Sequence, residues 1–181
     1  AICFDLEDSV TPDDKTAARD LVAAALPRFD AQGRLLVVRI NGLDTGLAEH
    51  DLEAVVGPNL HAINLPKCHS PDILRQVDAY LTFLERSRDL PAGHTKLIPW
   101  VESAQAIAQA YEICTASPRL LAVCLGAEDY ALSLGLPRTS AGAEIQFPRA
   151  LLANAAAAAG LLSIDTPLLN YTDAEGFQRD A

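Results

Sequence analysis

Acidic and basic side chains recur at one kind of place in this sequence, directly after short apolar runs. These residues are Glu7, Asp8, Arg39, Asn41, Lys67, Glu102, Glu128, Asp129 and Asp165. Magnesium takes one or two carboxylates together with waters and substrate oxygens, and the arginine fork binds a carboxylate through two parallel hydrogen bonds. If the fold gathers these side chains, they suit an anionic substrate held beside a divalent cation.

The apolar runs are typical of buried parallel strands, because they are short and rich in Val, Ile and Leu. They cover residues 1–6, 35–40, 62–65, 97–101, 120–125 and 161–164. Capping residues and apolar periodicity predict helices between them, over residues 11–25, 47–56, 70–84, 103–116 and 148–159. Strand and helix therefore alternate along the whole chain.

This alternation fits either a doubly wound open sheet or a TIM (β/α)8 barrel. The chain contains no GxGxxG and no GxxxxGK[ST] phosphate loop. A barrel builds its site from the ends of several strands, which is where the charges fall. We therefore expect an α/β TIM (β/α)8 barrel. Since six βα units are visible, the first and last strands should lie outside this chain, and residues 1–181 should form a single, partial barrel domain.

Pleat alternation favours one set of residues at the barrel mouth, because side chains two apart in a strand share a face. On that basis Glu7, Arg39 and Glu102 should converge, with Glu102 and Asp129 as the natural pair of metal ligands. Ordinary structural explanations also exist. Glu7 and Asp8 could be strand-end acids and Arg39 a rim ion pair. Glu102 could be a helix-start acid and Asp129 an N-cap.

Composition limits the classes of partner. The chain has 181 residues, half of them apolar, and a net charge of −10 without any block of Lys and Arg, so nucleic acid is not an expected partner. No apolar run approaches the ~18 residues of a membrane helix. The four cysteines form no CxxC pair and no secretory signal is visible, which indicates a cytoplasmic protein. The absence of Met and a start within a strand suggest a piece of a longer protein.

Six strings carry a family resemblance. In chain order they are DLEDSV (5–10), VRIN (38–41), LPK (65–67), IPWVESAQAI (98–107), LGAEDYALSLG (125–135) and SIDTP (163–167). Together they resemble the citrate lyase β-subunit-like branch of the HpcH/HpaI aldolase superfamily, over essentially the whole chain. The resemblance implies a TIM barrel that breaks or makes a carbon–carbon bond between an acyl-CoA enolate and a keto acid, with Mg²⁺ or Mn²⁺.

The resemblance also assigns roles by position. Glu102 and Asp129 match the metal ligands, and Arg39 matches the residue that holds the substrate's carboxylate. Glu7 and Asp8 match an acidic pair near the metal waters and Arg39, so Arg39, Glu7 and Asp8 are the expected catalytic residues.

Further positions complete the expected substrate site. Gly126 and Ala127 match the backbone turn against which the oxoacid rests, and Glu102 borders the substrate as well as the metal. The family's catalytic acid comes from a C-terminal arm that reaches a neighbouring subunit. That arm lies outside these residues, so no general base is assigned. A homo-oligomer, a trimer or a multiple of it, is expected.

The expected function is a Mg²⁺-dependent carbon–carbon lyase that cleaves or forms a 3-hydroxyacyl-CoA, such as citryl-, malyl- or citramalyl-CoA, giving acetyl-CoA and a keto acid. One alternative is a class II pyruvate aldolase acting on free hydroxy-keto acids. Another is a subunit of a lyase complex that receives its thioester from a carrier protein. A Schiff-base mechanism on Lys67 is disfavoured, since two strand-end carboxylates would then have no task.

Overall fold

A computed structural model of the chain describes residues 1–139, 141–168, 170 and 172–180. Its six strands form one parallel sheet in which each strand pairs with the next along the chain. The strands are β1 (Ile2–Asp5), β2 (Leu36–Arg39), β3 (Ala62–Leu65), β4 (Lys96–Val101), β5 (Ala122–Leu125) and β6 (Leu162–Ile164). Each coincides with an apolar run that the sequence predicts as a strand.

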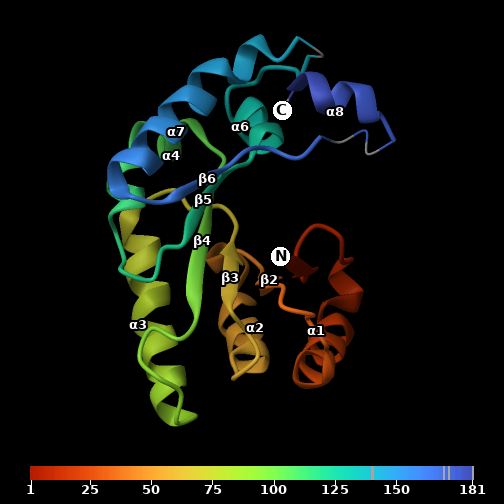
Figure 1. The fold of residues 1–181 in the computed structure, drawn as a ribbon, viewed down its shortest axis with the longest axis vertical. Helices are drawn as coiled ribbons and strands as arrows, with labels where there is room; N and C mark the ends of the chain where they lie inside the picture. The colour runs from red at the N-terminus through yellow and green to blue at the C-terminus, as the bar shows by residue number, and fades with distance from the viewer. Residues whose placement is uncertain (140, 169, 171, 181) are drawn as a thin grey trace.

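The helices surround the curved row of strands, most of them on its outer side (Figure 1). They are α1 (Lys15–Ala25), α2 (Ala48–Val55), α3 (Pro71–Ser87), α4 (Ala104–Ala108), α5 (Ala110–Cys114), α6 (Ala127–Ser133), α7 (Gln146–Ala159) and α8 (Ala174–Asp180). The sheet is not closed, because β1 and β6 stand at its two edges. This is the expected barrel architecture in partial form.

Strands in the middle of the sheet are largely buried on both faces, as a barrel requires. A large apolar core fills the space between strands and helices and includes Val38 and Ile63, which are fully buried. A second, smaller cluster lies on the inner face, with Trp100 packed against it; its buried members are Val37, Ala62, Ile98, Ala122 and Cys124. Pleat alternation therefore assigns the two faces as the sequence predicts.

One helix prediction is wrong. The segment 103–116 is not a single helix but two, α4 and α5, which meet at Gln109. The Gln109 backbone leaves the α region, with φ −116° and ψ 24°, and its amide donates to the Ala106 carbonyl, which closes a tighter turn. Its side-chain amide donates to the carbonyl of His69, 3.3 Å away, which ties this break to the loop after β3.

Two helices were not predicted. These are α6, whose first residue follows Gly126 directly, and the C-terminal α8. Within the described residues, no helix combines the length and the apolar character needed to cross a bilayer.

Candidate active site

Arg39 ends β2 and lies beside Asp5, its register partner at the end of β1. Arg39 Nε donates to Asp5 Oδ1 at 2.7 Å and Nη2 donates to Oδ2 at 2.5 Å, a two-bond fork. The Arg39 guanidinium carbon also lies 5.5 Å from the centre of the Trp100 ring, within cation–π range. Two neighbouring strands and the inner-face indole therefore fix the guanidinium.

The loop after β1 places two further acids at the same arginine. Glu7 Oε2 lies 3.0 Å from Arg39 Nη1, and Asp8 Oδ2 lies 3.6 Å from the same nitrogen. Lys67 Nζ approaches Glu7 Oε1 at 3.6 Å. Glu7 is only 5% exposed; this burial, reinforced by the charge of Asp8, raises the pKa of its carboxyl despite the opposing charges of Arg39 and Lys67.

Lys15, in the first turn of α1, holds this loop in place. Its Nζ donates to the carbonyl oxygens of Leu6 and Glu7 at 2.8 and 2.7 Å. The loop after β2 is held in a similar way. The buried Asp51 of α2 accepts hydrogen bonds from both the backbone and the side-chain nitrogen of Asn41. The loops that follow β1 and β2 are therefore each held by a side chain from the next helix.

Glu102 follows β4 and is 7% exposed. One of its oxygens, Oε1, accepts a hydrogen bond from the Lys67 backbone N–H. Lys67 adopts a left-handed backbone conformation with φ +52°, which is unusual for a residue with a Cβ. Its backbone N–H makes the hydrogen bond to Glu102 in this conformation. Burial raises the pKa of Glu102 to about 7, aided by the nearby charges of Asp129 and Glu7 and opposed by the Lys67 amide.

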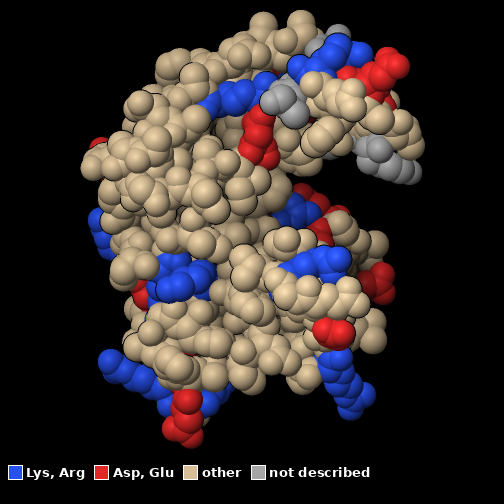
Figure 2. Space-filling view, viewed as in Figure 1, with Lys and Arg blue, Asp and Glu red and all other residues tan. Residues whose placement is uncertain are grey.

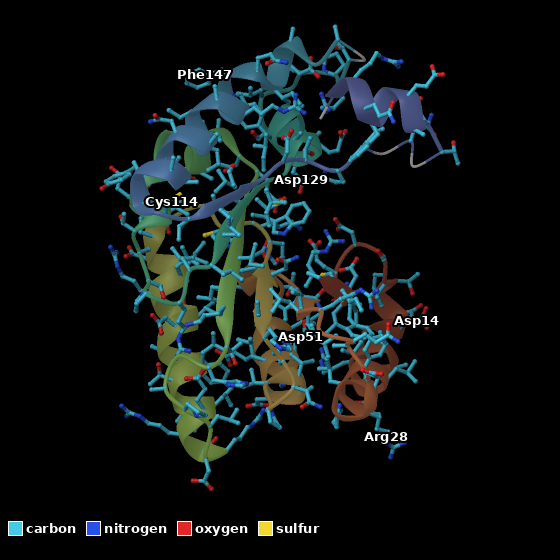
Figure 3. All side chains as sticks on the ribbon, viewed as in Figure 1. Asp14, Arg28, Asp51, Cys114, Asp129 and Phe147 are labelled. Atoms are coloured by element: carbon cyan, nitrogen blue, oxygen red, sulfur yellow. The ribbon has the colours of Figure 1, made fainter. Side chains whose placement is uncertain are left out.

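Asp129 lies in the first turn of α6, half-buried. Figure 3 places it below α6, toward the N-terminal elements, whereas Asp14 and Arg28 lie on the far side of α1. Its neighbour Glu128 forms an ion pair with Arg138 at 2.8 Å. Among the described residues, no cationic side chain forms an ion pair with Asp129 or Glu102.

These groups border a common cavity of about 320 Å³, and the molecule is hollowed on this side, with acidic and basic side chains on the walls (Figure 2). The lining combines most of the expected site residues with Trp100 and two residues that follow β6. The lining residues are Asp8, Arg39, Trp100, Glu102, Gly126, Ala127, Glu128, Asp129, Thr166 and Pro167. Glu7 lies just outside this lining, in an adjoining cavity of about 350 Å³ that also contains Lys67 and Asp8. The sequence prediction that Glu7, Arg39 and Glu102 gather at one mouth is consistent with this geometry.

The donor set fits a divalent cation. Glu102 and Asp129 are two acids at one cavity, and Glu102 is buried without an ion pair to any cationic side chain of the described residues. No group of three or more His, Cys, Asp or Glu side chains in the described part of the chain could enclose a metal by itself. A pair of carboxylates with open positions is what magnesium uses when waters and substrate oxygens complete its shell.

Gly126 and Ala127 line the cavity and also make structural contacts within the chain. A Cβ at Gly126 would overlap the side chain of Glu102, so this position makes room for the acid. The Gly126 amide donates to the Val101 carbonyl at 3.1 Å, and the Ala127 amide donates to Thr166 Oγ1 at 3.3 Å. Both residues line the cavity, but both amides have partners within the chain.

Sequence reasoning missed three residues of the site. Sequence analysis assigns Asp5 no role, because its pairing with Arg39 is set by strand register and not by spacing along the chain. Trp100 was left without a function, and Thr166 was not considered. No local pattern signals Thr166, since it reaches the cavity only through the pairing of β5 with β6.

The whole chain, residues 1–181, matches the family described as HpcH/HpaI aldolase/citrate lyase. The chain belongs to this family. It is 38% identical over 180 residues to the citrate lyase subunit beta of Leuconostoc mesenteroides subsp. cremoris, covering 99% of this chain and 60% of that protein. It is 36% identical over 201 residues to an L-malyl-CoA/beta-methylmalyl-CoA lyase of Cereibacter sphaeroides, covering 98% of this chain and 62% of that protein.

Solved structures of the family agree with the fold. The citrate lyase beta subunit of Mycobacterium tuberculosis, complexed with oxaloacetate and magnesium, superposes with a TM-score of 0.79 at 30% identity and covers 99% of this chain and 74% of that one. A structure of CitE from the same organism with magnesium, acetoacetate and coenzyme A gives 0.79 at 31% identity, covering 99% and 62%. The six-stranded sheet is thus part of a TIM-barrel-type fold. This HpcH/HpaI family chain spans about 60% of the length of the curated relatives it matches.

Proposed function

We propose that this chain carries the metal and oxoacid site of a Mg²⁺-dependent carbon–carbon lyase acting on a 3-hydroxyacyl thioester. The observation that carries the proposal is the cavity of about 320 Å³ bordered by Glu102, Asp129 and Arg39. Two acids without a cationic partner and one arginine match a substrate that brings both a chelating hydroxy or oxo group and a carboxylate.

The names of related proteins support the reaction class. Relatives that match across the chain are named citrate lyase subunit beta and L-malyl-CoA/beta-methylmalyl-CoA lyase. Structures of the Mycobacterium tuberculosis protein are described with magnesium together with oxaloacetate, pyruvate, or acetoacetate and coenzyme A. Citryl-CoA, malyl-CoA and citramalyl-CoA are the candidate substrates, and Mn²⁺ is a candidate replacement for Mg²⁺.

In this proposal Glu102 and Asp129 hold the cation. When bound, it supplies Lewis acidity that lowers the pKa of the substrate's hydroxyl and fixes the orientation of the oxoacid. Arg39 neutralises the substrate carboxylate, and Trp100 keeps the guanidinium plane in position. Burial of Glu102 excludes water from the reacting end, which strengthens each charge interaction there.

The acids of the β1–α1 loop complete the proposed catalytic set. Glu7 and Asp8 border Arg39, and Asp8 also lines the cavity. We assign them the task of holding protons and waters beside the reacting atoms. Gly126 and Ala127 are proposed to form the floor against which the oxoacid rests.

A direct assay tests the proposal. The full chain is incubated with each candidate thioester and Mg²⁺, and acetyl-CoA release is followed with and without EDTA. We expect release that EDTA abolishes and that Glu102→Gln lowers by at least about 1000-fold, since removing one stabiliser of developing charge already costs about 10²–10³. Glu112→Gln, the same change at an exposed acid on α5, is the matched control and should leave the rate unchanged.

The outcome also separates the alternatives. Cleavage of free hydroxy-keto acids without any thioester would favour a class II aldolase. Near-normal turnover in Glu102→Gln with Mg²⁺ present would contradict the proposal altogether.

One observation favours a second candidate. Two curated relatives that match the chain at 38% identity are named as subunits, so this chain is also a candidate partner in a larger complex that takes its acyl group from a carrier protein. Activity on carrier-bound thioesters alone, or only after other subunits are added, would identify this role.

Location and assembly form a further part of the proposal. Cys68, Cys114 and Cys124 are buried free thiols, which supports a reducing, cytoplasmic environment.

A homo-oligomer, a trimer or a multiple of it, is the proposed assembly, and sedimentation of the full chain tests it.

A further inference from the structure

Asp5 collects more hydrogen bonds than any neighbouring acid of the site. Its Oδ1 accepts from Arg39 Nε and from the Glu7 amide, at 2.7 and 2.9 Å. Its Oδ2 accepts from Arg39 Nη2, from Ser9 Oγ at 2.5 Å and from the Ser9 amide at 3.2 Å. One carboxylate therefore joins the end of β2 to the turn that carries Glu7 and Asp8.

The geometry of the fork decides which part of Arg39 faces the cavity. A guanidinium has a side edge, Nε with Nη2, and an end edge, Nη1 with Nη2, and either can hold a carboxylate through two hydrogen bonds. Asp5 occupies the side edge. The Nη1 end lies toward Glu7 and Asp8, at 3.0 and 3.6 Å, and Asp8 lines the cavity.

Asp5 itself is not a lining residue of that cavity. It stands behind Arg39, whereas Trp100 lies against the guanidinium face. Both carboxylate oxygens of Asp5 already accept hydrogen bonds within the chain, so Asp5 acts on an anionic substrate through the orientation of the Arg39 guanidinium.

We propose that Asp5 is a positioning residue that locks the side edge of Arg39 and thereby directs its end edge, which pairs with Glu7 through Nη1 in the free protein, toward the carboxylate of the substrate. The inference rests on the proposed function for its substrate, but the lock is a property of the free protein. It implies that loss of Asp5 weakens binding of the anionic substrate while the fold of the sheet is retained.

Three variants of the full chain test the lock. Asp5→Asn keeps the shape of the side chain but cannot accept both arginine hydrogen bonds and the Ser9 bonds together. Ser9→Ala removes the Oγ contact of the same turn and leaves the Arg39 fork intact. Asp72→Asn is the matched control, because Asp72 makes an exposed ion pair with Arg75 at 2.6 Å on α3.

The first readout is hydrogen exchange of the Arg39 Nε–H in arginine-labelled protein, with the signal assigned by its loss in Arg39→Lys. In the unmodified chain this proton should exchange at least ~10-fold more slowly than the Arg75 Nε–H, because it is held in a half-buried fork. Asp5→Asn should remove the slow exchange, and the Ser9 and Asp72 variants should retain it. An Arg39 proton that exchanges as fast as that of Arg75 in the unmodified chain overturns the proposal, even if Asp5→Asn does not fold.

The second readout is the split between KM and kcat. Asp5→Asn should raise KM for the anionic substrate by at least ~10-fold, since misorienting a charge-assisted fork removes binding made in ground and transition states alike. Ser9→Ala should change KM by less than ~3-fold. Unchanged KM in Asp5→Asn contradicts the positioning role. Absence of any turnover in the unmodified chain contradicts the proposed function instead, and the exchange measurement still decides the role of Asp5.

Discussion

Glu102 depends on a neighbour that has no side chain. The acid is buried against Gly126, where a Cβ would overlap both the Cβ and the carboxyl group of Glu102. Close approach of β4 and β5 thus requires glycine at this position, for a packing reason separate from backbone conformation. The Lys67 amide holds the same carboxylate through a hydrogen bond to Oε1.

Gly126→Ala should displace Glu102 and weaken Mg²⁺ binding, with a loss of stability of about 1–3 kcal/mol from overpacking. Calorimetric titration with Mg²⁺ and a thermal melt measure the two effects. Gly57→Ala is the matched control, because its added Cβ would meet only a backbone oxygen at 3.9 Å. Equal metal affinity in the two alanine variants would show that Gly126 does not shape the site.

At the scale of elements, the opposite end of the sheet has its own polar network. Arg119, before β5, is 4% exposed and donates to Glu85 of α3 through Nη1 and Nη2, at 2.6 and 2.8 Å. Its Nε donates to Asp78 of the same helix at 2.5 Å. Glu85 also accepts from the Thr95 amide before β4, at 2.8 Å. The network therefore joins α3 to the starts of two strands, away from the strand ends that carry the site.

Glu85→Gln should destabilise the fold by about 3 kcal/mol at pH 7, because it removes one of the two carboxylates that pair with the buried Arg119 and leaves only Asp78. Burial alone would raise the pKa of Glu85, but the hydrogen bonds from Arg119, Thr95 and Gly93 hold it below its usual range. A lowered folded pKa contributes stability that is complete above the unfolded value of about 4.3 and is lost as pH falls through the folded value.

Denaturant titrations from pH 3 to 7 check this linkage. The stability gap between the unmodified chain and Glu85→Gln should be constant between about pH 5.5 and 7 and should narrow below about pH 4. Mg²⁺ affinity at pH 7 should be the same in both proteins. A stability difference that widens on acidification would contradict a lowered pKa for Glu85 in the folded protein.

The sequence predicted the elements whose residues share one simple pattern of hydrophobicity. Five of the six strands fall within the predicted runs and β4 begins one residue earlier, at Lys96, because a fully buried parallel strand must be apolar at nearly every position. The break at Gln109 was not predictable, since the segment around it keeps helical composition and the break is fixed by a side-chain contact to the His69 carbonyl, distant in sequence. Asp5 was missed for a similar reason, as its partner is set by strand register with Arg39 and not by spacing along the chain.

At the scale of the whole molecule, the sheet ends in two unpaired edges. Leu162 and Ile164 of β6 are in register with the inner-face residues Ala122 and Cys124, yet they are 65% and 42% exposed. Apolar side chains on an inner face are buried when the strands close around them. The chain spans about 60% of its curated relatives, and these exposed positions are where further strands of a closed barrel would pack.

Hydrogen exchange of the 181-residue chain should therefore follow strand order. Backbone amides of β4, paired on both sides, should exchange slowest, and those of β6 should exchange at least ~10-fold faster, because one side of an edge strand lacks pairing partners. Mass spectrometry of proteolytic peptides resolves the two strands. Equal protection of β4 and β6 would mean that another segment covers the edge.

The central claim is that Glu102 and Asp129 together hold one divalent cation. The most direct measurement is Mn²⁺ binding followed by electron paramagnetic resonance, in the unmodified full chain, Glu102→Gln, Asp129→Asn and the double variant, with Glu112→Gln as control. We expect one bound ion, an affinity at least ~100-fold lower in each single variant, and little further loss in the double variant, since loss of groups that merely support a metal ligand costs about 10–100-fold. One bound ion with the same affinity in all five proteins would contradict the account.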